Sequence, residues 1–310
     1  MSLKKHLLFL RRKLFLNAIE KSLDTLLEKY FGQLNDLEKR ILLINDEIKR
    51  LEADVHDHIH DACISTSVMV GDNTQKLFTA YHINSQTFLP FKRCHQGKSI
   101  VILGAGPSVK NFKPIKDAIY IGLNRAFKYD KVSFDYLFAI DIQGIKDYHS
   151  DFFDYRDGRC IKFIGDQDYG DPKTDKSSYQ IPESFIKGQN VYRYITRTGG
   201  YFNERFTYHL DSEPLGNFST VSLQAMQFAL YTNPKKIYLV GIDCTTNGHF
   251  TGESNFLDNR SMENWKNDTC RAISDWKALK EFAHVYYPSI EIISVNPIGL
   301  KGLFNDLYQN

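Results

Sequence analysis

Apolar residues recur at alternating spacings of three and four between residues 27 and 55. This period is that of a heptad, which places one apolar seam along a helix. Charged residues fill most positions between them, and no proline interrupts the run. An ordinary surface helix has a 3.6-residue period and drifts off such a seam, so the strict repeat favours a coiled coil. The seam residues are Leu27, Tyr30, Leu34, Leu37, Ile41, Ile44, Ile48, Leu51 and Val55.

The heptad predicts a homo-oligomer that forms through residues 23–58. The alternative is a long helix that packs against its own globular domain. Leu34, Ile41, Ile48 and Val55 share one row of the seam and face mostly Leu and Ile in the other row. This composition favours a dimer.

A basic and strongly apolar segment, residues 4–16, precedes the seam. A helix of this composition can lie on an anionic membrane surface. The alternative is a helix end docked on the globular domain. No apolar run reaches the ~18 residues of a membrane span, and Leu7–Leu10 is too short for a signal peptide. We expect a cytoplasmic protein, with peripheral contact to the inner membrane face through residues 4–16.

The stretch that follows the heptad is less regular. Residues 63–97 show no clear period, so we expect a connector there. The chain then divides into an N-terminal helical, coiled-coil segment (1–62), the connector (63–97) and an α/β nucleotide-sugar-binding catalytic domain (98–310). Three histidines alternate with other residues between positions 56 and 60. Residues two apart on a helix point to different faces, so the three histidines do not all converge, and we expect a solvated helix end there.

From residue 99 onwards, short apolar runs alternate with helical patterns. Their β-branched and aromatic content predicts an α/β fold: a mostly parallel, doubly wound (Rossmann-like) sheet with helices on both faces. Helices are expected at 219–231, with Ser219 as N-cap, and at 262–287. The Asp-, Gly- and Ser-rich segment 165–214 is expected to be a long excursion from the sheet. The strands are expected at 99–103, 118–123, 136–140, 160–164, 236–240 and 290–295.

Composition excludes several classes of protein. A net charge of +2 gives no general attraction to nucleic acid. The five cysteines are scattered, and none forms a C-x-x-C pair. They therefore favour isolated thiols in a reducing compartment over a zinc site or a disulfide framework.

The first expected strand runs into a glycine-containing loop. Its residues are Gly104, Ala105, Gly106, Pro107 and Ser108. Glycines let the backbone approach a ligand closely, and the free N–H groups of a following helix favour a phosphate. A dinucleotide fingerprint needs a glycine at position 109 and an acid about 20 residues on. This chain has Val109 and Asn124 there, so a dehydrogenase is not expected.

Polar residues also follow three other expected strands. Asn124 and Arg125 follow the second strand, Asp141 follows the third, and Asp243 comes shortly after Gly241. In open parallel sheets, ligands bind outside the carboxyl ends of the strands. These residues therefore predict a nucleotide site, although Asn and Asp are also common as helix caps and in turns.

The loop after Asp243 carries His249 between Gly248 and Gly252. An imidazole titrates near neutral pH and suits a general base, so His249 and Asp243 are the catalytic candidates. The alternative is an ordinary surface histidine. No P-loop lysine pattern is present, and no metal is expected.

The motifs stand in a characteristic order: Gly104–Ser108, Asn124, Ser219–Val221, Lys236–Asp243 and Asn296–Pro297. This order resembles that of bacterial sialyltransferases of glycosyltransferase family 42, and the related motility-accessory-factor family has a similar skeleton. The resemblance covers residues 98–310. Its most specific part is the run that ends in Gly241, Ile242 and Asp243.

In that family, the glycine loop, the asparagine and the Ser/Thr-rich helix start hold a CMP-sugar. The resemblance implies direct displacement of the nucleotide by an acceptor hydroxyl, aided by a base. It implies no metal and no cofactor, because the donor nucleotide sugar is a substrate. The predicted binding residues are Gly104, Ala105, Gly106, Pro107, Ser108, Asn124, Arg125, Asp141, Ser219, Thr220 and Gly241.

The chain departs from the family at several positions. Ala105 replaces an asparagine of the first loop, and Thr245 and Thr251 replace two phosphate-binding tyrosines. Cys270 aligns with the family's catalytic histidine, which leaves His249 as the substitute base. The motility-accessory relatives often have a histidine and a glycine after this strand.

The expected function is a glycosyltransferase that transfers a sugar, such as a CMP-linked sialic acid, from a nucleotide donor to a surface glycan or glycolipid acceptor. Two alternatives stay open. One is a Mg-dependent nucleotide phosphotransferase with Asp141 and Asp243 as metal ligands, because pterin diphosphokinases share the glycine-loop skeleton. The other is a catalytically inactive scaffold, in which the heptad helix is the functional part.

Overall fold

The structure is a computed structural model. It describes residues 3–141, 144–167, 181–196, 206–216, 220–245, 248–250 and 262–309. The chain separates into two compact units, Met1–Asn73 and Thr74–Asn310. Among the described residues, no helix carries an apolar stretch that is long enough to cross a membrane.

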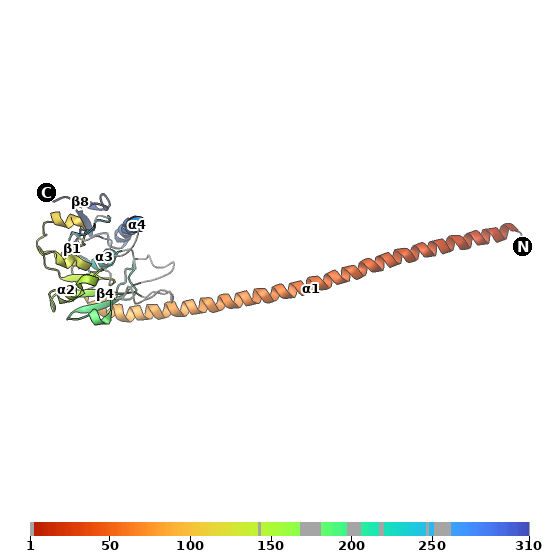
Figure 1. The fold of residues 1–310 in the computed structure, drawn as a ribbon, viewed down its shortest axis with the longest axis horizontal. Helices are drawn as coiled ribbons and strands as arrows, with labels where there is room; N and C mark the ends of the chain where they lie inside the picture. The colour runs from red at the N-terminus through yellow and green to blue at the C-terminus, as the bar shows by residue number, and fades with distance from the viewer. Residues whose placement is uncertain are drawn as a thin grey trace. The chain divides into compact units, whose positions relative to one another are not determined.

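A single helix, α1 (Leu3–Phe88), occupies the first unit and continues into the second (Figure 1). The expected helix over the heptad is therefore present. The segment 63–97 differs from the expected connector, because it remains helical as far as Phe88. The physical reason is that loss of the apolar period does not end a helix, whereas proline does. The first proline of the chain is Pro90, two residues after the end of α1.

The second unit is built on an eight-stranded sheet in the order β5-β4-β3-β2-β1-β6-β7-β8. Every neighbouring pair is parallel, which confirms the predicted fold class. The strands are β1 (Ser99–Leu103), β2 (Ile119–Leu123), β3 (Tyr136–Ala139), β4 (Ile161–Gln167), β5 (Val191–Thr196), β6 (Lys236–Val240), β7 (Glu291–Val295) and β8 (Asn305–Leu307).

Strands β5 and β8 were not expected from the sequence. The prediction that residues 165–214 leave the sheet is therefore wrong for β5, which pairs with β4 along six residues. Strand β8 has only three residues and forms an edge beside β7. Short edge strands show little apolar alternation, so periodicity does not reveal them.

Helices cover both faces of the sheet. One face packs against α3 (Val221–Tyr231), α4 (Met262–Tyr286) and the end of α1. The other face packs against α2 (His149–Asp154) and two 3-10 helices, η2 (Pro107–Asn111) and η3 (Asn124–Lys128). The helix expected after the glycine loop is thus only the five-residue η2. Pro107 begins η2 and fixes its first φ angle, and the chain turns extended again at Phe112.

The first face holds a cluster of buried aromatic rings centred on Phe228 of α3. Its ring centroid lies between 4.9 and 6.1 Å from those of Phe88, Phe91, Tyr136, Phe138 and Phe163. Because Phe88 is the last residue of α1, the end of that helix belongs to the core of the second unit.

Replacing Phe228 with Ala should lower the free energy of unfolding of the sheet unit by about 3–5 kcal/mol, because it removes a fully buried ring and leaves a cavity. Urea unfolding followed by tryptophan fluorescence measures this loss. Phe78→Ala is the matched control, because Phe78 is 72% exposed. An equal effect of the two substitutions would contradict the assigned core.

Candidate functional site

The candidate site lies where β1 and β6 meet. The chain proceeds from β1 to β2 and β3 on one side, while β6 and β7 extend the sheet on the other. The carboxyl ends of β1 and β6 therefore form a topological switch point, which is where open α/β sheets bind ligands. The glycine loop follows β1, and the turn of Gly241 to Asp243 follows β6.

These two turns pack against each other through their backbones. The N–H of Gly104 donates to the carbonyl of Val240 at 2.8 Å, and that of Gly106 donates to the carbonyl of Gly241 at 2.9 Å. A Cβ at either of the two loop glycines would lie 2.6 Å from the Gly241 carbonyl oxygen. The glycines are therefore required for contact between the turns.

The side chain of Asp243 holds the glycine loop through two hydrogen bonds. Its carboxylate accepts from the backbone N–H of Ser108 at 2.9 Å and from the Ser108 hydroxyl. Both residues are buried. Burial raises the pKa of Asp243 above its usual value, and the two hydrogen bonds from Ser108 partly oppose that rise. The contacts of this carboxylate position the loop.

The glycine loop does not offer the free amides that the sequence predicted for a phosphate. The N–H groups of Gly104, Gly106 and Ser108 are all used within the protein. Pro107 has no N–H. Ala105 is the one residue of this loop whose N–H finds no acceptor in the described part of the chain.

His249 lies in a segment that is tied to the glycine loop. The N–H of its neighbour Phe250 donates to the carbonyl of Ala105 at 2.9 Å, and the Phe250 ring packs on Tyr129. The structure therefore places the backbone of the segment that carries the predicted base beside the glycine loop. Thr251, which the resemblance singled out, lies outside the described residues.

Asn124 and Asp141 meet at Gly144. The N–H of Gly144 donates to Asp141 Oδ1 at 3.0 Å, and a Cβ at Gly144 would lie 2.6 Å from Asn124 Nδ2. Asn124 has a φ of 49°, which Asn tolerates better than most residues. Its buried Oδ1 has no partner among the described atoms. The amide is thus placed at the strand ends with hydrogen-bonding capacity left over.

Arg125 and Thr220 occupy different settings. Arg125 is buried, and its guanidinium carbon lies 5.2 Å from the centre of the Tyr148 ring. Thr220 is the N-cap of α3, because its Oγ1 accepts from the N–H of Ser222. Ser219, the expected cap, lies outside the described residues. The cap is one residue later than the sequence suggested.

The structure adds two polar residues that sequence reasoning missed. Tyr194 on β5 and Gln224 on α3 are fully buried, and the phenol donates to Gln224 Oε1 at 2.7 Å. Gln224 Nε2 has no partner among the described atoms. Burial and the nearby Asp141 raise the pKa of Tyr194 well above its usual value, so the phenol keeps its proton. The β-branched and aromatic residues of 191–196 were the signal available in the sequence.

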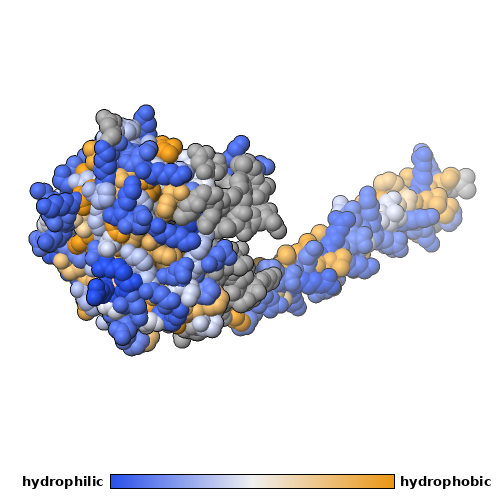
Figure 2. Space-filling model, turned by 60° about the vertical axis from the view of Figure 1, so that its left-hand side comes forward, coloured by the Kyte–Doolittle hydropathy of each residue, from blue (hydrophilic) through white to orange (hydrophobic). Residues whose placement is uncertain are grey.

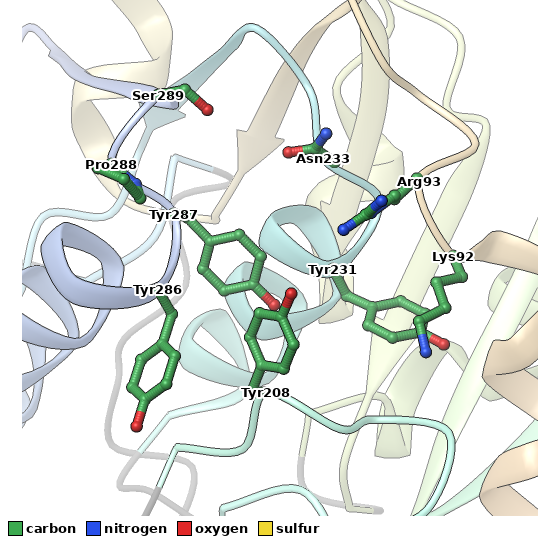
Figure 3. Close-up of a pocket in the computed structure, with 9 residues that line it drawn as sticks. All are labelled: Lys92, Arg93, Tyr208, Tyr231, Asn233, Tyr286, Tyr287, Pro288 and Ser289. Atoms are coloured by element: carbon green, nitrogen blue, oxygen red, sulfur yellow. The ribbon is translucent and has the colours of Figure 1, made fainter.

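A pocket of about 100 Å³ lies at the opposite edge of the sheet, before the amino ends of β6 and β7 (Figure 3). The rings of Tyr208 and Tyr287 pack together there, 5.4 Å apart. Lys92 and Arg93 also line it. None of the predicted site residues does, so this pocket is separate from the switch point.

Comparison with known proteins gives one structural similarity. No protein-family model matches the chain. No curated protein matches it either. Among solved structures, a sialyltransferase, Cst-II, in complex with CMP matches with 15% identity and a TM-score of 0.35, and the match covers 64% of this chain and 80% of that one. A similarity of this degree does not assign a function.

Replacing Ser108 with Ala tests the hydrogen bonds by which Asp243 holds the glycine loop. The variant lacks the hydroxyl donor, so the pKa of Asp243 should rise further above 3.8. The folded form then holds a proton that the unfolded form has released, and stability is lost as the pH rises through the folded pKa. We expect a cost of about 1–3 kcal/mol at pH 7 and a smaller cost near pH 4.

Urea unfolding at both pH values measures this difference. Ser289→Ala removes an exposed hydroxyl and should cost the same at both. If Ser108→Ala lowered the free energy of unfolding equally at the two pH values, the hydrogen bond from the Ser108 hydroxyl to the ionised Asp243 would be ruled out.

Proposed function

We propose that residues 98–310 form a glycosyltransferase domain. It transfers a sugar from a nucleotide donor, with a CMP-linked acidic sugar favoured, to a hydroxyl of a glycan or glycolipid. The observation that carries the proposal is the meeting of the glycine loop, Asp243 and the His249 segment at the β1–β6 switch point. The motif order that resembles family 42 supports a sugar nucleotide as the ligand.

In the proposed reaction, the acceptor oxygen bonds to the anomeric carbon while the bond from that carbon to the donor's phosphate oxygen breaks. The acceptor proton passes to His249, and the nucleoside monophosphate leaves. The hydrogen bond from Phe250 to Ala105 supports this role, because it keeps the segment of the base beside the donor loop.

Neutral groups would hold the leaving phosphate. The remaining N–H of the glycine loop belongs to Ala105; the side chain of Asn124 follows β2, and that of Thr220 caps α3. The contacts of Asp243 favour this scheme over the magnesium-dependent phosphotransferase. Both of its oxygens accept hydrogen bonds from Ser108, which leaves the carboxylate poorly prepared to ligate a metal.

CMP should raise the melting temperature of the protein in the absence of magnesium. A ligand that binds only the folded state at a hundredfold excess over its Kd adds about 2.7 kcal/mol, or roughly 5–10 °C for a unit of this size. Thermal melts with CMP, UDP, GDP and ATP, each with and without magnesium, measure the shift. A shift with ATP and magnesium alone would favour the phosphotransferase, and no shift with any nucleotide would favour the scaffold.

His249→Ala separates binding from chemistry. It should keep the CMP shift and lower turnover of a CMP-sugar by about 100-fold or more, because a general base contributes 10²- to 10⁴-fold. His284→Ala is the control, because His284 lies on α4, outside the switch point. Unchanged turnover in His249→Ala would remove the assignment of the base.

We also propose that residues 4–16 hold the enzyme at a membrane surface, near lipid-linked acceptors. Seven large apolar side chains of this segment are 46–71% exposed on α1, and five Lys and Arg side chains flank them. Apolar insertion and attraction to anionic lipid would act together.

Deleting residues 1–16 should abolish sedimentation with anionic liposomes and leave binding of CMP unchanged. Neutral liposomes are the control, because the basic residues gain nothing from them. Equal liposome binding by the full-length and shortened chains would disprove the membrane contact.

A further inference from the structure

The heptad seam of α1 has no partner in the described chain. Its nine apolar side chains, Leu27 to Val55, are each 46–60% exposed. Figure 2 shows that apolar and hydrophilic side chains both lie on the surface of α1. An isolated helix gains nothing from such a stripe, and contiguous exposed apolar surface marks an interaction site.

We propose that this seam pairs with that of a second copy of the chain as an antiparallel, two-stranded coiled coil. The proposal is independent of the chemistry at the sheet. It adds an orientation and a register to the homo-oligomer that the heptad predicts, and both follow from the residues at and beside the seam.

An antiparallel register fits eight of the nine seam residues, and the ninth, Leu27, lies opposite the partner's His58. When paired residue numbers add up to 85, Tyr30 meets the partner's Val55, and Ile41 meets the partner's Ile44. Leu34 then meets the partner's Leu51, and Leu37 meets the partner's Ile48. Each layer occurs twice by symmetry, so the seam from residue 30 to residue 55 is buried with no polar residue in any layer.

The charges beside the seam decide the orientation. In the antiparallel register, Arg40 faces the partner's Glu47, and symmetry repeats this attractive pair. In a parallel dimer, Glu47 would instead face the partner's Glu52 twice. Arg40 would face only the neutral Asn45 of the partner subunit. Like charges across the seam are unfavourable, so the sequence favours antiparallel pairing.

The two orientations separate the native Cys63 side chains very differently. Cys63 is exposed on α1. In the antiparallel register it lies opposite position 22 of the partner, and the intervening helix places the two Cys63 about 60 Å apart at 1.5 Å per residue. In a parallel dimer, the two would face each other across the pair, within roughly 20 Å.

Pulsed electron resonance on the full chain measures this distance. Cys94, Cys244 and Cys270 are replaced with Ser, while the buried Cys160 stays, so that a spin label attaches at Cys63. We expect twice the 35.9 kDa mass in solution and a label separation near 60 Å. A monomer, a larger assembly or a short separation would overturn the proposal.

A charge reversal at position 47 should change the dimer affinity in opposite directions for the two orientations. Glu47→Arg should raise the dissociation constant of the antiparallel dimer roughly tenfold. The new arginine at position 47 of each chain would face the partner's Arg40, which makes two repulsive pairs. The same change would strengthen a parallel dimer by pairing with the partner's Glu52. Adding Arg40→Glu should restore the affinity.

Asp46→Arg is the matched control, because it makes the same charge change on the outer side of the helix. Sedimentation at low salt measures the dissociation constants. Tighter association of Glu47→Arg, or equal weakening by Asp46→Arg, would overturn the antiparallel register.

Discussion

The close backbone contact between the turns after β1 and β6 organises the carboxyl edge of the sheet. Gly104 and Gly106 approach Gly241 so closely that no side chain fits between them. Two main-chain hydrogen bonds and the Ser108–Asp243 pair then hold the turns together. Other loops attach to this unit, since the N–H of Gly299 donates to the carbonyl of Asp243 at 2.9 Å.

This constraint changes which groups are left for a ligand. The amides of a glycine loop normally favour an anion, but here three of them are used to join the turns. In the proposed enzyme, the chemistry of the edge depends on side chains from several separate loops, such as Asn124 and His249. The glycines therefore bring one backbone segment close to another here, and the proposed ligand-binding groups come from the surrounding segments.

The sequence predicted the parallel sheet and the edge at which the polar residues gather, because buried strands and the residues after them follow simple local rules. It could not predict the partner of each amide. Whether Ser108 donates to a phosphate or to Asp243 depends on a contact between residues 135 positions apart. Strand β8 could not be predicted either, because its three residues form a strand by pairing with β7 and show no apolar pattern of their own.

The end of α1 shows why the boundary between helix and domain is not at residue 98. The Asn84 side chain accepts from the N–H of Ile195 and donates to the carbonyl of Glu213, both at 2.8 Å, which fixes the last turns of α1 to β5. Phe88 packs 5.7 Å from Tyr194, the phenol that binds Gln224. Residues 74–97 therefore belong to the sheet unit by their contacts, although α1, which reaches Phe88, begins in the first unit. Because one unbroken helix carries both the exposed heptad seam and Phe88, the element that bears the seam also completes the core beneath β4 and β5.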